Sequence, residues 1–269
     1  MADFMGRKYS YAEMAATVRR VARGLQDKGI GKGDQIGLFL PNVPQYIAAY
    51  YGALAAGATV VNFSPLYTVD ELAHQVADSG TSILITVSAA ALLPTAMKVL
   101  DNSSLKELIV GSVSEALPKA KGWAYRLFKR NEIVALPSDS RVSSYAELIA
   151  NIGDYAVQPC IPEKDIAQLQ YTGGTTGKSK AVILTTRGEL TELSAFLTDL
   201  VPEINEGDVF LHAAPIAHAS GAFFLPALVR GAHAVVMPKF DAEEFLKLAE
   251  HSKASATFLV PTMIAMLLE

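Results

Sequence analysis

The 269-residue sequence has little cysteine, a single tryptophan and no excess of positive charge. Its one cysteine, Cys160, cannot form an internal disulfide, which fits a reducing compartment, and we expect it to be a small core residue. The 23 basic residues are outnumbered by 27 acidic ones, so the chain lacks the basic face that nucleic acid requires. Nucleic acid is therefore not an expected partner.

Long apolar runs are also missing. Prolines, charged residues and amides interrupt every apolar stretch before the roughly 20 residues that a membrane-spanning helix needs. The first residues, Met1 to Arg7, hold no apolar core of signal-peptide length. Together these absences predict a cytoplasmic protein.

Strand and helix patterns alternate along most of the chain. Capping boxes at Ser10–Glu13 and Thr68–Glu71 open two helices. Further segments follow the same alternation, with strands expected at 35–40, 59–63, 83–87, 209–213 and 234–237, and helices at 44–57, 188–200 and 242–251. This pattern predicts an α/β fold with mostly parallel β-sheets flanked by helices.

The segment Lys119–Arg130 mixes cations with Trp123, Tyr125 and Phe128. One interpretation is a basic aromatic patch that touches a membrane surface. The other is an exposed helix or loop that covers the sheet, which the acidic balance of the whole chain favours.

The richest chemical signal is the run Tyr171–Lys180, with the sequence YTGGTTGKSK. Its glycines permit positive φ and a close approach of the backbone to a ligand. Successive backbone amides in such a turn form an anion-binding concavity, and the lysines add positive charge. We interpret the run as a phosphate-binding loop rather than a plain linker.

A P-loop NTPase is one alternative for this run. The motif G-x-x-x-x-G-K-[ST] needs a glycine where Thr172 stands, and its loop must open a helix. The following segment 181–186 is short, apolar and β-branched, and the preceding segment 166–171 also reads as a strand. The sequence therefore favours a strand–loop–strand arrangement.

The run resembles the phosphate-loop signature Y-T-[SG]-G-T-T-G-x-[PS]-K-[GA] of the adenylate-forming (AMP-dependent) acyl-CoA synthetases. The segments LPNVPQY (40–46), PIAH (215–218) and VPT (260–262) also resemble this family, and VNFSPLYT (61–68) resembles its bacterial long-chain fatty acid–CoA ligases in particular. Two positions depart from the usual pattern, Ser179 in place of proline and Ala181 in place of glycine.

The resemblance implies an acid–thiol ligase that uses ATP, Mg²⁺ and coenzyme A to activate a carboxylic acid, with a fatty acid as the expected substrate. It places the β- and γ-phosphates of ATP on the loop residues Thr172, Gly173, Gly174, Thr175, Thr176 and Gly177. Thr172 would also lie near the magnesium ion, and Lys180 would neutralise the leaving pyrophosphate and act in catalysis with Thr176. Lys178 would be an auxiliary charge.

By the same resemblance, His218 would lie beside the acyl carboxylate, with Phe223 and Phe224 as wall residues. The residues alone leave open that His218 is a satisfied core histidine and that both phenylalanines are simply core.

The resemblance further implies that the chain is the N-terminal part of the large adenylating domain. We expect a partial first α/β subdomain over 1–160, a second one over 161–269 that carries the phosphate loop, and no C-terminal small domain. Such a fragment would have little ligase activity alone. A non-catalytic nucleotide-binding remnant, a homodimer and a peripheral contact with the inner membrane face stay open.

Overall fold

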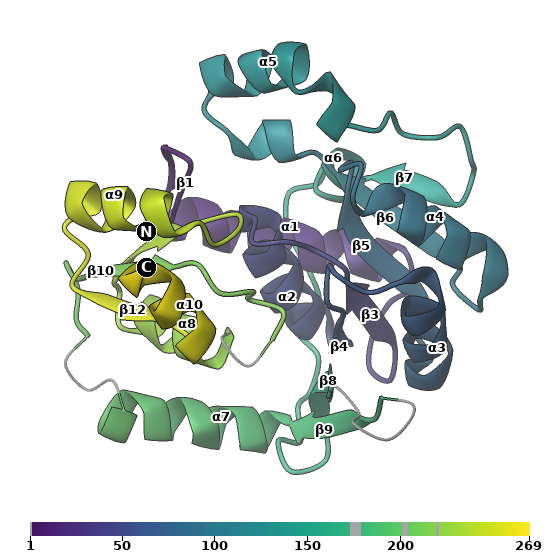
Figure 1. Cartoon of the computed structure of the whole chain (residues 1–269). Helices are drawn as coiled ribbons and strands as arrows, with labels where there is room; N and C mark the ends of the chain where they lie inside the picture. The colour runs from purple at the N-terminus through teal and green to yellow at the C-terminus, as the bar shows by residue number, and fades with distance from the viewer. Residues whose placement is uncertain (1, 173–178, 201–203, 219–220) are drawn as a thin grey trace.

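Two largely parallel β-sheets organise the part of the chain that the structure describes. This computed structural model describes residues 2–172, 179–200, 204–218 and 221–269, without the side chains of Leu200 and Phe223. Within those residues the strands form one sheet of seven and one of five, and helices lie around and between them (Figure 1). The predicted α/β class with mostly parallel sheets is confirmed.

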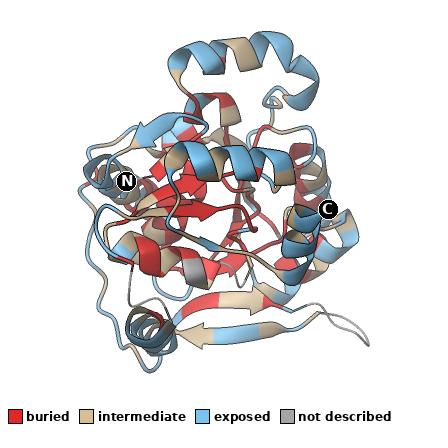
Figure 2. Ribbon diagram, turned by 60° about the vertical axis from the view of Figure 1, so that its left-hand side comes forward, coloured by how far each residue is buried: buried red, intermediate tan, exposed pale blue. Residues whose placement is uncertain are grey.

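The seven-stranded sheet has the order β7-β6-β5-β3-β4-β8-β9 and is parallel except for the antiparallel pair β8–β9. Every residue of β4 and β5 is buried, as expected for parallel strands covered on both faces (Figure 2). The strands are β3 Gln35–Leu38, β4 Thr59–Asn62, β5 Ile83–Val87, β6 Glu107–Gly111, β7 Val142–Ser144, β8 Ile166–Tyr171 and β9 Ala181–Thr185.

The five-stranded sheet has the order β12-β10-β11-β1-β2 and is parallel except for the pair β1–β2. It joins the start of the chain to its later part, because β1 pairs with β11. Its strands are β1 Ala2–Phe4, β2 Arg7–Tyr9, β10 Val209–His212, β11 His233–Val236 and β12 Ala256–Phe258.

Helices follow most strands and make the connections between parallel neighbours. The α-helices are α1 Tyr11–Asp27, α2 Pro44–Ala56, α3 Val69–Ser79, α4 Leu93–Asn102, α5 Lys119–Phe128, α6 Tyr145–Leu148, α7 Thr186–Ala195, α8 Gly221–Val229, α9 Ala242–Ser252 and α10 Pro261–Leu268. Short 3₁₀ turns lie at η1 Val113–Ala116 and η2 Arg130–Glu132, and a π-helical turn, η3 Phe196–Leu200, extends α7. None of the described helices is both long enough and apolar enough to span a bilayer.

Both predicted capping boxes are present. The side chain of Ser10 accepts a hydrogen bond from the backbone N–H of Glu13, and the backbone N–H of Ser10 donates to the Glu13 carboxylate. Thr68 and Glu71 form the same reciprocal pair at the start of α3. These local signals fix where α1 and α3 begin, independently of tertiary contacts.

The main hydrophobic core forms where α1 and α2 lie between the two sheets (Figure 1). Nearly every residue of α2 is buried, which explains its almost uniformly apolar sequence. A side chain added at Gly24 of α1 would place its Cβ 2.1 Å from the backbone oxygen of Leu148 in α6. Glycine is therefore required at this helix contact.

We expect Gly24→Ala to lower the free energy of unfolding by about 1–3 kcal/mol, since the backbone of α6 would have to shift. Gly31→Ala is the matched control, because no atom lies within 4 Å of a Cβ at that position. Urea denaturation of both variants tests this, and equal stabilities would contradict the close packing of α1 on α6.

The structure corrects one prediction and leaves another untested. Cys160 is exposed and is not a core residue, because it lies in an irregular segment that pairs with no strand. Sheet membership crosses the proposed boundary at residue 160 in both directions, since β8 and β9 complete the first sheet while β1 and β2 belong to the second. The two subdomains, 1–160 and 161–269, stay a prediction.

Candidate active site

The glycine-rich run lies at the turn of the β8–β9 hairpin. Tyr171 pairs with Ala181 across the two strands, and the backbone N–H of Thr172 donates to the oxygen of Lys180 at 3.1 Å. Gly173, Gly174, Thr175, Thr176, Gly177 and Lys178 lie outside the described residues. The predicted strand–loop–strand arrangement is confirmed, and because β9 rather than a helix follows the loop, the P-loop NTPase alternative gains no support.

Side chains of α3 hold the base of this loop. The hydroxyl of Tyr171 donates to the Asp78 carboxylate at 2.6 Å. On the other strand, the Gln75 side-chain amide donates to the Ser179 hydroxyl at 3.0 Å, and Gln75 itself is fully buried. Ser179, which departs from the usual proline, thus accepts a hydrogen bond that proline could not accept.

Two of the residues predicted to bind phosphate, Thr172 and Lys180, lie in the described part of the chain on either side of the glycine-rich run. Thr172 and Lys180 are both exposed, and the Lys180 ammonium makes no ion pair with any described residue. A lysine without a carboxylate partner beside a glycine-rich sequence is suited to an anion. The arrangement fits the phosphate role assigned to these residues, which no contact in the structure tests.

Asn42 joins the carboxyl ends of the two sheets. It follows β3, is buried, and donates through Nδ2 to the backbone oxygens of Ala214 at 2.8 Å and Met237 at 3.0 Å. Its Oδ1 accepts from the backbone N–H of Ile216 at 2.9 Å. One side chain therefore positions the segment that precedes His218.

A chain of buried and half-buried amides continues from this point into the first sheet. Gln170 of β8 accepts from Asn62 of β4 at 3.3 Å and from Gln168 at 3.0 Å. Tyr46 and Tyr50 of α2 donate to Asn62 and Gln168, at 2.8 and 2.9 Å. Gln170 then donates to the backbone oxygen of Ala217 at 3.3 Å, so the chain of hydrogen bonds ends next to His218.

His218 lines a mostly apolar cavity of about 300 Å³. Burial lowers the pKa of its imidazole, which favours the neutral form. The same cavity is lined by alternate residues of the hairpin, Gln168 and Gln170 from β8 and Val182 and Leu184 from β9. The strands that carry the glycine-rich turn thus also form a wall of the cavity.

Of the two phenylalanines predicted as possible wall residues of the acyl site, the structure describes the side chain of only one. Phe224 is a core residue, since it is fully buried with its ring 4.8 Å from that of His212. Burial also lowers the pKa of His212 to about 4, so that this histidine is a neutral core residue. The side chain of Phe223 lies outside the described part of the structure.

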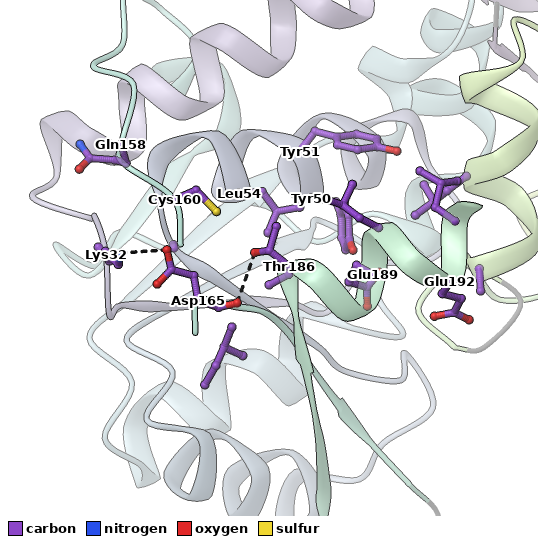
Figure 3. Close-up of a pocket in the computed structure, with 18 of the residues that line it drawn as sticks. Lys32, Tyr50, Tyr51, Leu54, Gln158, Cys160, Asp165, Thr186, Glu189 and Glu192 are labelled. Carbon is purple, nitrogen blue, oxygen red and sulfur yellow. Dashed lines mark hydrogen bonds and ion pairs between the residues drawn. The ribbon is translucent and has the colours of Figure 1, made fainter. Parts of the chain in front are cut away.

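A second cavity of about 260 Å³ adjoins the first along α7 (Figure 3). The two share lining residues from α2, α7, η3 and α8, including Tyr50, Glu189, Phe196 and Leu225. At its far end an ion pair joins Lys32 and Asp165 at 2.8 Å. The cavity walls are largely apolar, so together the two spaces suit an elongated apolar group.

Glu189 is one of two carboxylates, with Glu192, that line both of these largely apolar cavities. Burial, with repulsion from Glu192, raises the pKa of its carboxyl to about 7. The raised folded-state pKa means that ionisation of Glu189 opposes folding as pH rises from the unfolded value through 7.

We expect Glu189→Gln to stabilise the fold by about 1–2 kcal/mol more at pH 8 than at pH 5, since the half-buried carboxyl is partly screened by solvent. Chemical denaturation at the two pH values measures this difference. Glu250→Gln, at an exposed position on α9, is the control and should show no such pH dependence. Identical pH profiles for wild type and Glu189→Gln would contradict the burial of this carboxyl.

Several residues of this region were missed in the sequence. Asn42, Asn62, Gln168 and Gln170 all lie at or near the carboxyl ends of parallel strands, where open α/β sheets bind ligands. A signal was available for Gln168 and Gln170, because polar residues at i and i+2 of a strand share one face. Asn42 lies in the segment 40–46 that resembles the family, but its role in joining the sheets gave no signal, since its partners lie more than 170 residues away.

Comparison with known proteins agrees with this geometry. The family model described as AMP-binding enzyme matches residues 1–269, and the chain belongs to this family. Among curated relatives, a long-chain-fatty-acid–CoA ligase of Bacillus subtilis is 33% identical over 97% of this chain and 47% of its own length. A Dictyostelium discoideum protein named probable 4-coumarate–CoA ligase 1 is 30% identical over 97% of this chain and 46% of its own length.

Solved structures share the fold over the whole chain. A long-chain-fatty-acid–CoA ligase from Archaeoglobus fulgidus superposes with a TM-score of 0.78 at 23% identity, covering 99% of this chain and 49% of that one. ATP-bound MatB from Rhodopseudomonas palustris gives 0.78 at 21% identity, covering 100% and 47%. The chain thus spans about half the length of the relatives it matches.

Proposed function

We propose that the protein containing this chain is an AMP-forming acid–thiol ligase, which activates a carboxylic acid with ATP and transfers the acyl group to coenzyme A. The observation that carries the proposal is that one hairpin contributes to both the predicted phosphate loop and the His218 cavity. β8 and β9 present a glycine- and lysine-rich turn at one end and line the His218 cavity with their side chains. A triphosphate on the turn and an acid in the cavity would therefore meet at the carboxyl edge of the sheet.

The first step joins the two substrates. A carboxylate oxygen of the acid attacks the α-phosphorus of ATP. The bond between the α-phosphorus and the oxygen that bridges it to the β-phosphorus breaks, and pyrophosphate leaves. Such a reaction depends on positioning and on stabilising the leaving charge. Lys180 and the loop amides would hold the departing phosphates, with Thr172 beside them. Mg²⁺, when bound, would neutralise part of their charge.

The acid would lie with its carboxylate near His218 and its chain along α7. Asn42 and Gln170 fix the segment 214–217 through its backbone, so His218 is presented by a rigid support. The adjoining apolar cavities favour a fatty or aromatic acid over a small polar one. Relatives named as fatty-acid and coumarate ligases support this class of substrate.

The test is ATP–pyrophosphate exchange with a panel of fatty, aromatic and short polar acids, measured on the longest reading frame that contains this chain and on the 269-residue chain itself. We expect exchange that requires an acid in the longer protein, and little or none in the chain alone. ATP hydrolysis without any acid would contradict the ligase assignment. ATP binding without exchange in the longer protein would favour a non-catalytic remnant.

A further inference from the structure

Helix α5 stands away from the body of the molecule (Figure 1). It is attached along one side, where Gly122 is buried and a Cβ there would lie 2.5 Å from the backbone oxygen of Ser114. On the same side, Arg126 Nε donates to the Ser114 hydroxyl at 2.8 Å. These contacts fix which face of α5 points away from the protein.

The outward face is apolar. Trp123 and Phe128 expose 69% and 78% of their surface, and Leu127, one turn after Trp123, exposes 38%. Ala120 and Ala124 fill the positions between them at helical spacing, so the strip is continuous. Aromatic side chains of this size are seldom left exposed together on a surface that only meets water.

Cations border this apolar strip on both sides. The segment 119–132 contains one carboxylate, Glu132, and five cations, although the whole chain has a net charge of −4. The five cations are Lys119, Lys121, Arg126, Lys129 and Arg130. Lys129 pairs with Glu132 at 2.6 Å and Arg126 with Glu115 at 3.8 Å, whereas Lys119 and Arg130 form no ion pair with any described residue. The basic charge is thus concentrated where the apolar side chains are exposed.

We infer that α5 is an interfacial helix that docks the protein on an anionic lipid surface. An apolar face bordered by lysine and arginine, with tryptophan and phenylalanine, is the pattern of helices that lie in the plane of a membrane surface. Trp123, Leu127 and Phe128 enter the boundary between headgroups and acyl chains, and the flanking cations contact lipid phosphates. This inference does not depend on the proposed ligase activity.

A protein partner fits the same helix less well. Stable protein interfaces need about 800 Å² from each partner and matched shapes. A protruding helix of 10 residues, roughly 15 Å long, offers a convex ridge and little area. A lipid surface needs no complementary shape, so a ridge with large exposed aromatic side chains and excess positive charge suits it better.

The single tryptophan makes the test direct, because all tryptophan fluorescence reports on α5. The 269-residue chain is titrated with vesicles of phosphatidylglycerol mixed with phosphatidylcholine, and with phosphatidylcholine alone. We expect a blue shift of the emission and quenching by brominated acyl chains with the anionic vesicles. Binding should weaken at least tenfold with phosphatidylcholine alone or at about 1 M salt.

Variants separate the contribution of the apolar side chains to vesicle binding from that of the positive charges. Leu127→Ser with Phe128→Ser, and separately Lys119→Gln with Arg130→Gln, should each reduce vesicle binding at least tenfold in a flotation assay. Ile152→Ser, which changes a 90% exposed apolar residue away from α5, should leave binding unchanged. Circular dichroism confirms that each variant is folded.

Three outcomes would overturn the inference. One is an emission spectrum that no vesicle changes, and another is equal binding of the variants and wild type. The third is a blue shift that depends on protein concentration without lipid, which would identify a second copy of the chain as the occupant of α5.

Discussion

Asn42→Ala is expected to lower the free energy of unfolding by about 3–5 kcal/mol. The variant would leave three buried backbone groups, the oxygens of Ala214 and Met237 and the N–H of Ile216, without their hydrogen-bond partner. Each unsatisfied buried group costs about 1–3 kcal/mol. Urea denaturation monitored by circular dichroism measures the loss.

Two further variants show whether the effect belongs to this junction. Asn42→Asp keeps an acceptor for Ile216 but has no donor for the two carbonyls, so it should be nearly as destabilising as Asn42→Ala. Asn102→Ala removes an exposed amide that bonds only within α4 and should change the stability by less than about 0.5 kcal/mol. If Asn42→Ala were as mild as Asn102→Ala, Asn42 would not join the two sheets.

Lys180→Ala is expected to weaken binding of MgATP by about 10- to 100-fold. Lys180 is exposed directly before β9, at the end of the glycine-rich run, and makes no ion pair with the described residues. Its charge is therefore available to an anion. A hydrogen bond to a charged group contributes about 1.5–3 kcal/mol, which corresponds to that range of affinity. Isothermal titration calorimetry at constant ionic strength measures the change.

The control for charge alone is Lys164→Ala, which removes an exposed lysine two residues before β8 and should leave the affinity within about twofold. Lys180→Arg should retain part of the affinity, because it keeps the charge while changing the reach. Equal affinities for Lys180→Ala and wild type would remove Lys180 from the phosphate site.

The predictions that succeeded rest on local signals. The β-branched segment 181–185 and its partner 166–171 predict two strands around the glycine-rich turn, and the structure pairs them as antiparallel neighbours with one register shift between Ile166 and Gln168. The capping boxes at Ser10 and Thr68 act within one helical turn, so they can be recognised without tertiary information. The glycines and lysines of the run indicate phosphate binding, and the family resemblance assigns its residues to the phosphates of ATP; both stay predictions.

The features that were missed depend on contacts between distant segments. β1 is a three-residue strand that exists because it pairs with β11, more than 200 residues later. Asn42 and Gln170 look like ordinary polar residues until the two sheets are placed side by side. Cys160 was expected in the core from the average behaviour of free cysteine, but its irregular segment leaves it exposed.

The α5 segment is a second case in which the sequence alone could not predict the structure. Composition alone left a membrane-contacting patch and a helix that covers the sheet as alternatives. The structure shows a helix with Trp123 and Phe128 exposed, because Gly122 and Arg126 occupy the attached side. The direction of the exposed face comes only from tertiary packing, and the membrane contact of this face stays a proposal.

The most direct measurement of the central claim is competition for MgATP on the 269-residue chain. If the β8–β9 turn binds a triphosphate, then MgATP binds saturably, inorganic tripolyphosphate displaces it and adenosine does not. In the same titration, the amide resonances of Thr172 and Lys180 shift with either triphosphate. Displacement by adenosine alone, or resonances at Thr172 and Lys180 that no triphosphate moves, would contradict the assignment of this turn as the phosphate site.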